Sequence, residues 1–269
     1  MDPVSIILLG IVQGITEWVP VSSKTQDTFV FLRVLHGDPA LVVPALLYLH
    51  VGTVLAAALY FRADIRNLAR DLLDRPLEAK TLARREPGFL FTALLFTGLV
   101  GVPLLLLEIL VLPNLNGSLL FAVMGAGLIA TGAVLTLRKG TKTRGKEQAG
   151  WRDGVLTGLF QGLSVLPGVS RAGTSTTGLI LRGFDSEASF HLSFLLSIPT
   201  VVLAEILFYL GGGLGKLPLV DGLALLAASF GSGYLAIDVV LRVVKRVNLG
   251  VLAIALGLLI IISGLAGAG

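Results

Sequence analysis

Six long apolar segments constrain this chain more than any other feature of its sequence. Each is long enough to cross a bilayer as a helix, because a hydrocarbon core of about 30 Å needs about 20 residues. Only 14% of the 269 residues are charged, whereas a soluble domain carries roughly 25%. Together these observations indicate a polytopic membrane protein rather than a soluble protein with buried helices. The segments are 40–61, 89–112, 118–137, 190–210, 219–241 and 249–266.

The rest of the composition narrows the classes of function. The chain has no cysteine, which excludes disulfide bonds, thiolate catalysis and cysteine-ligated metals. The formal net charge is +4, but the basic residues are not interleaved with aromatic ones, so no nucleic acid is expected as a partner. The chain begins Met1-Asp2-Pro3 without a basic segment, and we therefore expect no cleavable signal peptide.

The charges of the loops predict how the segments are oriented. Short loops rich in Lys and Arg lie on the cytoplasmic side of a membrane, and the chain has three such clusters, at 62–88, 138–152 and 242–246. The turns at 113–117 and 211–218 carry almost no charge and are predicted to lie outside.

Counting crossings between these loops leaves two regions that do not cross. Residues 153–189 begin and end inside, and residues 1–39 are expected to enter and leave from outside. We therefore predict an all-α integral membrane protein with six transmembrane helices plus two re-entrant helical hairpins in an inverted-topology repeat. The first repeat spans 1–137, a cytoplasmic loop spans 138–150, and the second repeat spans 151–269.

The two predicted hairpins are similar in sequence. Residues 10–23 read GIVQGITEWVPVSS, and residues 158–171 read GLFQGLSVLPGVSR. Paired broken helices in corresponding halves point to a shared binding site. We expect the two tips to meet inside the bundle, because irregular backbone at membrane depth must be covered by protein or water. The alternative is that residues 4–19 form a marginal span and that the similarity is a coincidence.

The first tip carries a carboxylate into apolar sequence. Gln13 and Glu17 are four residues apart and share a helix face, and a glutamate inside a membrane is by default a functional-site hypothesis. Ser22, Ser23 and Lys24 follow at the break. Hydroxyls and an ammonium beside a carboxylate can position a phosphate and activate a nucleophile. The competing interpretation is a serine cluster that caps the next helix.

The second tip carries an arginine. Arg171 follows Ser170 between two apolar runs, and its planar fork suits bidentate binding of a phosphate. Gly168 and Gly173 let backbone N–H groups approach an anion, and a helix that starts near Thr174 would aim its N-terminus at the same group. The competing interpretation is that Arg171 snorkels to the lipid headgroups.

These motifs resemble those of the undecaprenyl pyrophosphate phosphatases of the bacitracin-resistance (BacA/UppP) type. Gln13-x-x-x-Glu17 is similar to the family's (Glu/Gln)-x-x-x-Glu motif, and Pro167-Gly-x-Ser170-Arg171 to its Pro-Gly-x-Ser-Arg motif. The resemblance implies a plasma-membrane hydrolase that removes one phosphate from an undecaprenyl-type polyprenyl diphosphate, which recycles the lipid carrier of envelope biogenesis. It also implies a site that faces the extracytoplasmic side and a dependence on a divalent cation, Mg²⁺ or Ca²⁺.

The resemblance further implies roles for individual residues. Glu17 would handle protons or, with Gln13 in place of a carboxylate, hold the metal. Ser23 is the candidate nucleophile beside Ser22, and Arg171 completes the catalytic set. The expected partners are the lipid and the bilayer, and a homodimer is left open. The substrate-binding candidates are Gln13, Lys24, Gln26, Ser170, Gly168, Gly173, Thr174 and Ser175.

One position departs from the family's pattern. Bacterial members carry a histidine where this chain has Gln26, and an amide cannot exchange a proton at neutral pH. Either Glu17 carries the acid–base role alone, or the chain belongs to a divergent, archaeal-type branch. His50 and His191 are expected to be packed or hydrogen-bonded, and His36 to lie in a loop. We assign no role to the carboxylates of Glu108, Glu205, Asp221 and Asp238.

Two other functions stay open. Inverted repeats with broken helices are typical of secondary transporters, so a transporter or flippase of a polyprenyl phosphate lipid is the alternative. A catalytically inactive lipid-binding protein is a third. The phosphatidic-acid phosphatase type-2 superfamily is disfavoured, because no histidine follows Ser170-Arg171 until His191.

Overall fold

The computed structural model describes residues 1–74, 85–111, 116–136, 143–210, 217–243 and 247–266. Within these ranges the chain is helical and has no strand, and six helices are long and apolar enough to cross a membrane. This confirms the predicted all-α membrane fold. The parts of the predicted loops at 75–84, 112–115, 137–142, 211–216 and 244–246 lie outside the described residues. The six long helices are α3 (Val42–Tyr60), α5 (Arg85–Val111), α6 (Gly117–Thr136), α9 (Ser186–Leu210), α10 (Leu219–Val243) and α11 (Leu249–Ala266).

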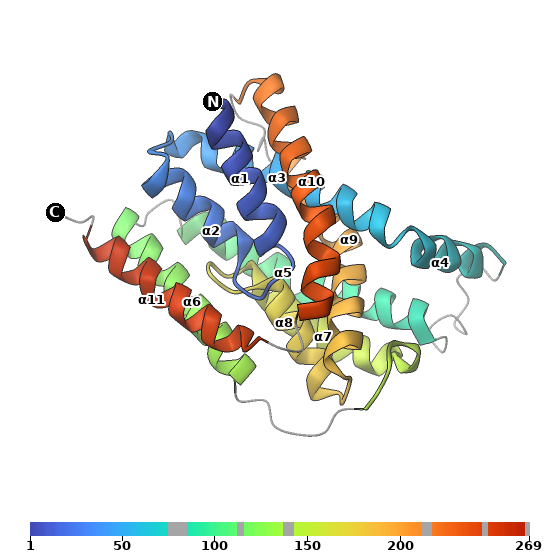
Figure 1. The fold of residues 1–269 in the computed structure, drawn as a ribbon. Coiled ribbons are helices and arrows are strands. Elements are labelled where there is room, and N and C mark those ends of the chain that lie inside the picture. Colours follow the sequence, from blue (N-terminus) through green and yellow to red (C-terminus); the bar gives the residue numbers. More distant parts are fainter. Residues whose placement is uncertain (75–84, 112–115, 137–142, 211–216, 244–246, 267–269) are drawn as a thin grey trace.

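Two pairs of shorter helices lie among the long ones (Figure 1). The first pair is α1 (Pro3–Thr16) and α2 (Ser23–Phe29), and the second is α7 (Trp151–Gly162) and α8 (Arg171–Leu181). They fall in the regions predicted as hairpins. Their entry into a bilayer from opposite faces, and the division of the chain into two inverted repeats, stay predictions.

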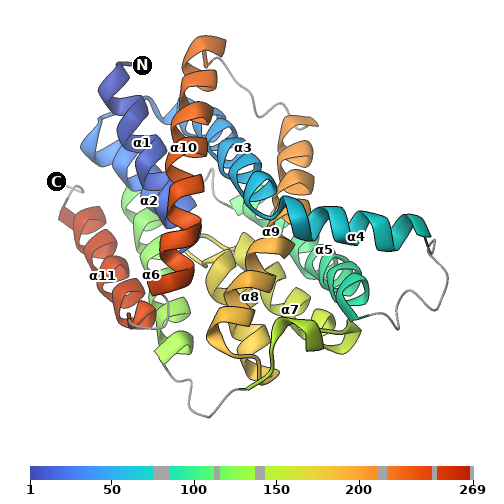
Figure 2. The same ribbon diagram turned by 45° about the vertical axis from the view of Figure 1, so that its right-hand side comes forward.

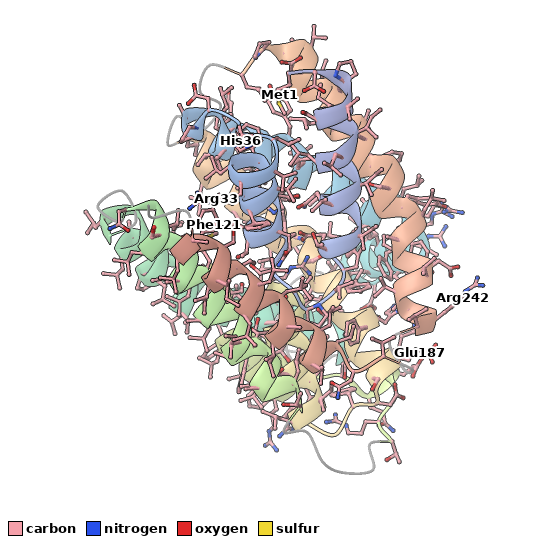
Figure 3. The ribbon with its side chains drawn as sticks, turned by 60° about the vertical axis from the view of Figure 1, so that its left-hand side comes forward. Met1, Arg33, His36, Phe121, Glu187 and Arg242 are labelled. Atoms are coloured by element: carbon pink, nitrogen blue, oxygen red, sulfur yellow. The ribbon has the colours of Figure 1, made fainter. Side chains whose placement is uncertain are left out.

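The first pair of short helices begins and ends at the same end of the molecule. Met1 and Leu41, which precede α1 and α3, pack on one hydrophobic cluster with Leu217, which precedes α10. Figure 3 shows Met1 and His36 toward this end and Arg242 toward the other. The chain therefore turns back within the bundle between α1 and α3.

The second pair of short helices, α7 and α8 (Figure 2), is held by an ion-pair network. Asp153 at the start of α7 accepts hydrogen bonds from Arg144 at 2.9 and 3.0 Å and from Arg182 at 2.6 Å. Burial alone would raise the pKa of Asp153, but the hydrogen bonds from the two guanidinium groups lower it. The network ties the segment before α7 to the end of α8.

Glycines that are identical in the two copies pack in the same way. A Cβ on Gly14 of α1 would lie 2.5 Å from the backbone nitrogen of Gly233 in α10, and a Cβ on Gly162 of α7 would lie 2.5 Å from Val100 in α5. These short distances let α1 approach α10, and α7 approach α5, through their backbones. The first helix of each pair thus packs on a long helix of the other half.

The identical glutamines also have matching partners. Gln13 and Gln161 are both fully buried. Gln13 donates to Thr53 of α3 at 3.3 Å, and Gln161 donates to Thr200 of α9 at 3.0 Å. A buried amide needs such partners, so the repeated glycines and glutamines are explained by scaffold contacts.

The polar segment after α3 differs from its prediction as a loop. Residues 62–74 form α4 (Arg62–Asp74), which extends sideways from the bundle in Figures 1 and 2. Ile65 and Leu68 of α4 pack against the cluster that contains Phe61. We predicted a loop because the segment is strongly charged. Its apolar residues nevertheless recur at the spacing of an amphipathic helix, and their packing stabilises a helix at the surface.

Candidate active site

The two helix breaks meet, as expected, through an ion pair. Arg171, the first residue of α8, donates through Nη2 to Oε1 of Glu17, which directly follows α1. The two side chains are only 14% and 7% exposed. Gly173 lies against the other tip, because a Cβ there would be 3.2 Å from Pro20. Two charged groups from distant parts of the chain are therefore joined inside the bundle.

Unusual backbone conformations shape both tips. Ser22 has a left-handed φ of 56°, which few non-glycine residues adopt. Gly168 has a φ of 84°, and a Cβ there would lie 1.8 Å from the carbonyl oxygen of Met124, so only glycine fits. The hydroxyl of Ser170 then caps α8 by accepting from the backbone N–H of Gly173 at 3.2 Å.

The Glu17 carboxylate is surrounded by donors. Its Oε2 accepts from the Ser23 hydroxyl at 2.6 Å and from the Gln13 amide at 3.1 Å, while Arg171 occupies Oε1. Ser22 instead lies 3.0 Å from the Thr25 hydroxyl. Ser23 is therefore the serine placed to give its proton to Glu17, within the reach that a general base needs.

A cavity of about 400 Å³ adjoins this cluster. Glu17, Ser23 and Arg171 line it, and Arg171 Nη1 is buried and has no hydrogen-bond partner among the described residues. Most of the surface of the cavity is apolar, so the cavity suits a ligand with a charged head and a hydrocarbon tail. The apolar walls come from Leu94, Gly98, Gly101, Val102 and Leu105 of α5 and Val201, Leu203, Ala204, Ile206 and Leu207 of α9.

Three charged or titratable residues of this cavity were assigned no role from the sequence. The Lys24 ammonium is 2.5 Å from the Glu108 carboxylate, so Glu108 of α5 holds the predicted phosphate-binding lysine. His50 of α3 lies between Glu17 and Glu205 of α9, and all these side chains line the cavity. An ionisable side chain inside a transmembrane segment was the signal that could have identified them.

Several predicted binding residues make structural contacts instead of lining the cavity. Gln26 donates to the Val21 carbonyl at 3.0 Å, and Thr174 donates to the carbonyls of Ser170 and Arg171. Ser175 is fully buried, with its hydroxyl 2.6 Å from that of Ser193 in α9. Of the predicted set, the cavity is lined by Glu17, Ser22, Ser23, Lys24, Ser170 and Arg171. Gln13 reaches the site through its bond to Glu17, and Gly168 and Gly173 shape the backbone.

The donor set fits a resident divalent cation poorly. Mg²⁺ and Ca²⁺ take several oxygen ligands, but both oxygens of Glu17 already accept hydrogen bonds, and Gln13 turns its amide nitrogen toward Glu17. Across the described part of the chain, no three His, Asp or Glu side chains converge as a metal-binding group. We therefore assign no metal ligand and derive no step from a cation.

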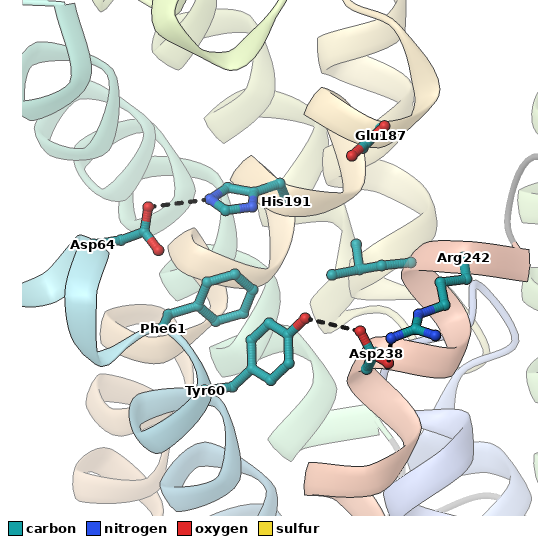
Figure 4. A pocket seen from close by; sticks show the side chains of 8 residues that line it. Tyr60, Phe61, Asp64, Glu187, His191, Asp238 and Arg242 are labelled. Carbon is teal, nitrogen blue, oxygen red and sulfur yellow. Dashed lines mark hydrogen bonds and ion pairs between the residues drawn. The ribbon is translucent and has the colours of Figure 1, made fainter.

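A second cavity of about 350 Å³ lies elsewhere, at the ends of α3 and α10 (Figure 4). Its lining includes Asp64, which is 3.4 Å from His191, and Asp238, which bonds Tyr60. None of the residues of the Glu17 cluster lines it. It offers side chains of the same types as matched controls.

Comparison with known proteins identifies the family. The sequence model of the family described as "Bacitracin resistance protein BacA" matches residues 6–262. The chain belongs to this family. A relative from Haloarcula marismortui named "Undecaprenyl-diphosphatase" is 34% identical over 98% of both chains. Relatives with the same name from Methanococcoides burtonii and Saccharolobus solfataricus are 35% and 36% identical, over 96% of this chain and 96% and 94% of theirs.

Proposed function

We propose that this chain is a membrane-embedded undecaprenyl-diphosphatase, which hydrolyses a polyprenyl diphosphate to the monophosphate carrier and inorganic phosphate. The observation that carries the proposal is the convergence of Arg171, Glu17 and Ser23 in the lining of a mostly apolar cavity. The names of the relatives give the class of lipid. They favour the phosphatase over the transporter.

Arg171 and Glu17 divide the work in this proposal. The guanidinium of Arg171, whose Nη1 has no partner among the described residues, and the N-terminus of α8 bind the terminal phosphate. As Arg171 turns to the phosphate, Glu17 loses its strongest partner and becomes a better acceptor for the proton of the attacking oxygen. Fixed positive groups at the phosphate stabilise the charge that develops in the transition state.

The setting of the reaction is part of the same proposal. We place the protein in the plasma membrane with the site on the extracytoplasmic side, as the resemblance to the family implies, and the loop charges give the orientation of the helices. The dependence on a divalent cation, Mg²⁺ or Ca²⁺, that the resemblance implies stays part of the proposal, and phosphate release with and without the cation tests it. A homodimer stays open in this proposal.

The test uses the purified full chain in detergent with a polyprenyl diphosphate and Mg²⁺. We expect released phosphate from the wild type, and a decrease of about 10²–10⁴ in turnover for Glu17→Gln, because that variant loses a positioned base. Arg171→Gln should lose turnover as well. Both variants should elute as single species, which separates lost chemistry from lost folding.

Glu187→Gln is the matched control, since Glu187 lines the other cavity. It should keep wild-type turnover. If the wild type releases no phosphate, but vesicles that contain it move the monophosphate lipid across the bilayer, the transporter replaces the phosphatase.

A further inference from the structure

We propose that His50 is a further acid–base residue of the reaction and that Glu205 orients it, so that a proton relay leads from Ser23 through Glu17 to α9. The proposal rests on the proposed phosphatase function. Ser23 Oγ is 2.6 Å from Glu17 Oε2, which is 3.8 Å from His50 Nε2. On the other side of the ring, His50 Nδ1 is 3.3 Å from Glu205 Oε1.

Two carboxylates fix the charge of the His50 ring. An ionised carboxylate only accepts, so both ring nitrogens carry a hydrogen, Nδ1 on the side of Glu205 and Nε2 on the side of Glu17. A carboxylate behind a histidine orients the ring and stabilises the imidazolium. His50 and Glu205 are 18% and 14% exposed, and both line the substrate cavity.

His50 supplies what position 26 lacks. The Gln26 amide is bonded to the Val21 carbonyl, away from the cavity lining. His50 of α3 is distant from Glu17 in sequence, but its Nε2 lies 3.8 Å from the Glu17 carboxylate. A histidine beside Glu17 is therefore present, although it comes from another helix.

The charged groups that face His50 come from three elements. They are Glu17 after α1, Asp27 of α2 and Glu205 of α9. α10 also packs along α3, and at the neighbouring Gly52 it brings Ser229 and Phe230, which do not titrate. The carboxyl groups around the ring favour the positive charge that the ring gains when it takes a proton.

The relay balances for each hydrolysis. The attacking oxygen bonds to the terminal phosphorus and gives its proton to Oε2 of Glu17, while the P–O bond to the lipid monophosphate breaks and Nε2 of His50 gives its proton to the departing oxygen. The proton on Glu17 then passes to Nε2 of His50, which restores the carboxylate and the imidazolium. If Ser23 Oγ attacks, the phosphate is first bound to Ser23, and a water then releases it, keeping one hydrogen on the phosphate and returning the other through Glu17 to Ser23 Oγ.

The experiment is chemical rescue of His50→Ala with added imidazoles, read as phosphate release from polyprenyl diphosphate. We expect His50→Ala to lose about 10²–10⁴ in turnover and imidazole to restore at least tenfold in a saturable manner. The rescued rate should depend on the pKa of the added imidazole, because the added imidazolium supplies the proton that His50 supplies in the wild type. His50→Gln should stay inactive, and Glu205→Gln should lower kcat more than it raises KM.

His191→Ala is the matched control, because His191 is a half-buried histidine of the other cavity (Figure 4). The His191→Ala variant should keep wild-type turnover, and added imidazole should not change its rate. Wild-type turnover in folded His50→Ala or His50→Gln, or a loss in folded His50→Ala that no imidazole repairs, overturns the relay. An inactive wild type in the same assay counts against the phosphatase itself, which keeps the two failures distinct.

Discussion

Ser23 and Ser22 are neighbours in sequence but have different surroundings. The Ser23 hydroxyl is bonded to Glu17, whereas that of Ser22 faces Thr25 from a left-handed backbone. A nucleophile must lie within hydrogen-bond reach of its base. The choice of attacking oxygen therefore narrows to Ser23 or to a water that Glu17 holds.

Replacing Ser23 by alanine separates these two mechanisms. If Ser23 attacks, Ser23→Ala should lose about 10³-fold or more in kcat, as nucleophile removal does in serine enzymes. If water attacks, turnover should stay within about tenfold of wild type. Released phosphate measures the rate, and Ser22→Ala shows the cost of losing a nearby hydroxyl that does not touch Glu17.

At the scale of single residues, the sequence alone was enough to select the candidates whose charge is costly inside a membrane. Glu17 and Arg171 were predicted because an unpaired charge inside a membrane is costly. His50, Glu108 and Glu205 were missed, because their importance depends on which helices stand beside them. Thr174 and Ser175 were predicted to bind the substrate, but their hydroxyls form hydrogen bonds with other groups of the protein. The polarity of a side chain alone does not distinguish a hydroxyl that binds substrate from one that stabilises the fold.

At the scale of elements, two glycines near the contact of α5 and α7 serve different purposes. A Cβ on Gly158 of α7 would lie 2.4 Å from the carbonyl oxygen of Ala93 in α5, so the residue permits the two backbones to touch. A Cβ on Gly98 of α5 would meet nothing within 4 Å, and Gly98 lines the apolar wall of the cavity. Gly98 thus leaves room for the substrate.

Gly98→Leu should narrow the cavity without disturbing the fold. We expect KM for a long-chain diphosphate to rise about tenfold, because losing two buried methylene groups costs about 1.6 kcal/mol. A short, water-soluble diphosphate should be hydrolysed at the wild-type rate. Gly158→Leu is the contrasting variant, which should fail to accumulate as folded protein. If Gly98→Leu leaves the KM for the long-chain diphosphate unchanged, the hydrocarbon tail of the substrate does not bind beside Gly98.

The hydrogen bonds of Asp153 with Arg144 and Arg182 should make the free energy of unfolding depend on pH. Because the pKa of Asp153 is lowered in the folded state, its contribution is complete above the unfolded value near 4 and is lost as the pH falls through the folded value. Asp153→Asn should therefore destabilise the protein by about 1.5–3 kcal/mol at pH 7 and by less in acid.

Thermal unfolding in detergent at neutral and acidic pH measures this difference. Asp238→Asn is the control, because Asp238 is 44% exposed in its pair with Arg242 and such pairs contribute at most about 1 kcal/mol. An equal Tm for Asp153→Asn and wild type at pH 7 would show that the network does not anchor the two helices.

At the scale of the whole molecule, the two similar segments make matching packing contacts but carry different charged residues. The repeated glycines and glutamines make matching contacts, whereas Glu17 of one copy faces Arg171 of the other. The six long helices were predictable because their length and hydrophobicity suffice. α4 was not predicted, because its many charged residues favoured a loop over an amphipathic helix. The packing of α1 on α10 was not predicted either, because the two helices are far apart in sequence.

The predicted orientation can be tested with single cysteines, since the chain has none of its own. Ala40→Cys, exposed at the start of α3, should react with a membrane-impermeant maleimide in intact cells. Gln148→Cys, exposed before α7, should react only after the membrane is permeabilised. The reverse pattern would invert the topology and place the site on the cytoplasmic side.

The apolar end of the cavity reaches the flank of the molecule. Leu203, Ile206 and Leu207 line the cavity and are each about half exposed, at 49%, 48% and 49%. In a bilayer this flank would contact acyl chains, so we expect a prenyl tail to enter the cavity sideways from the bilayer without crossing an aqueous phase. Encounter is then a two-dimensional search: the quantity that sets the rate is the mole fraction of the lipid in its leaflet, and the volume of the surrounding solution is irrelevant.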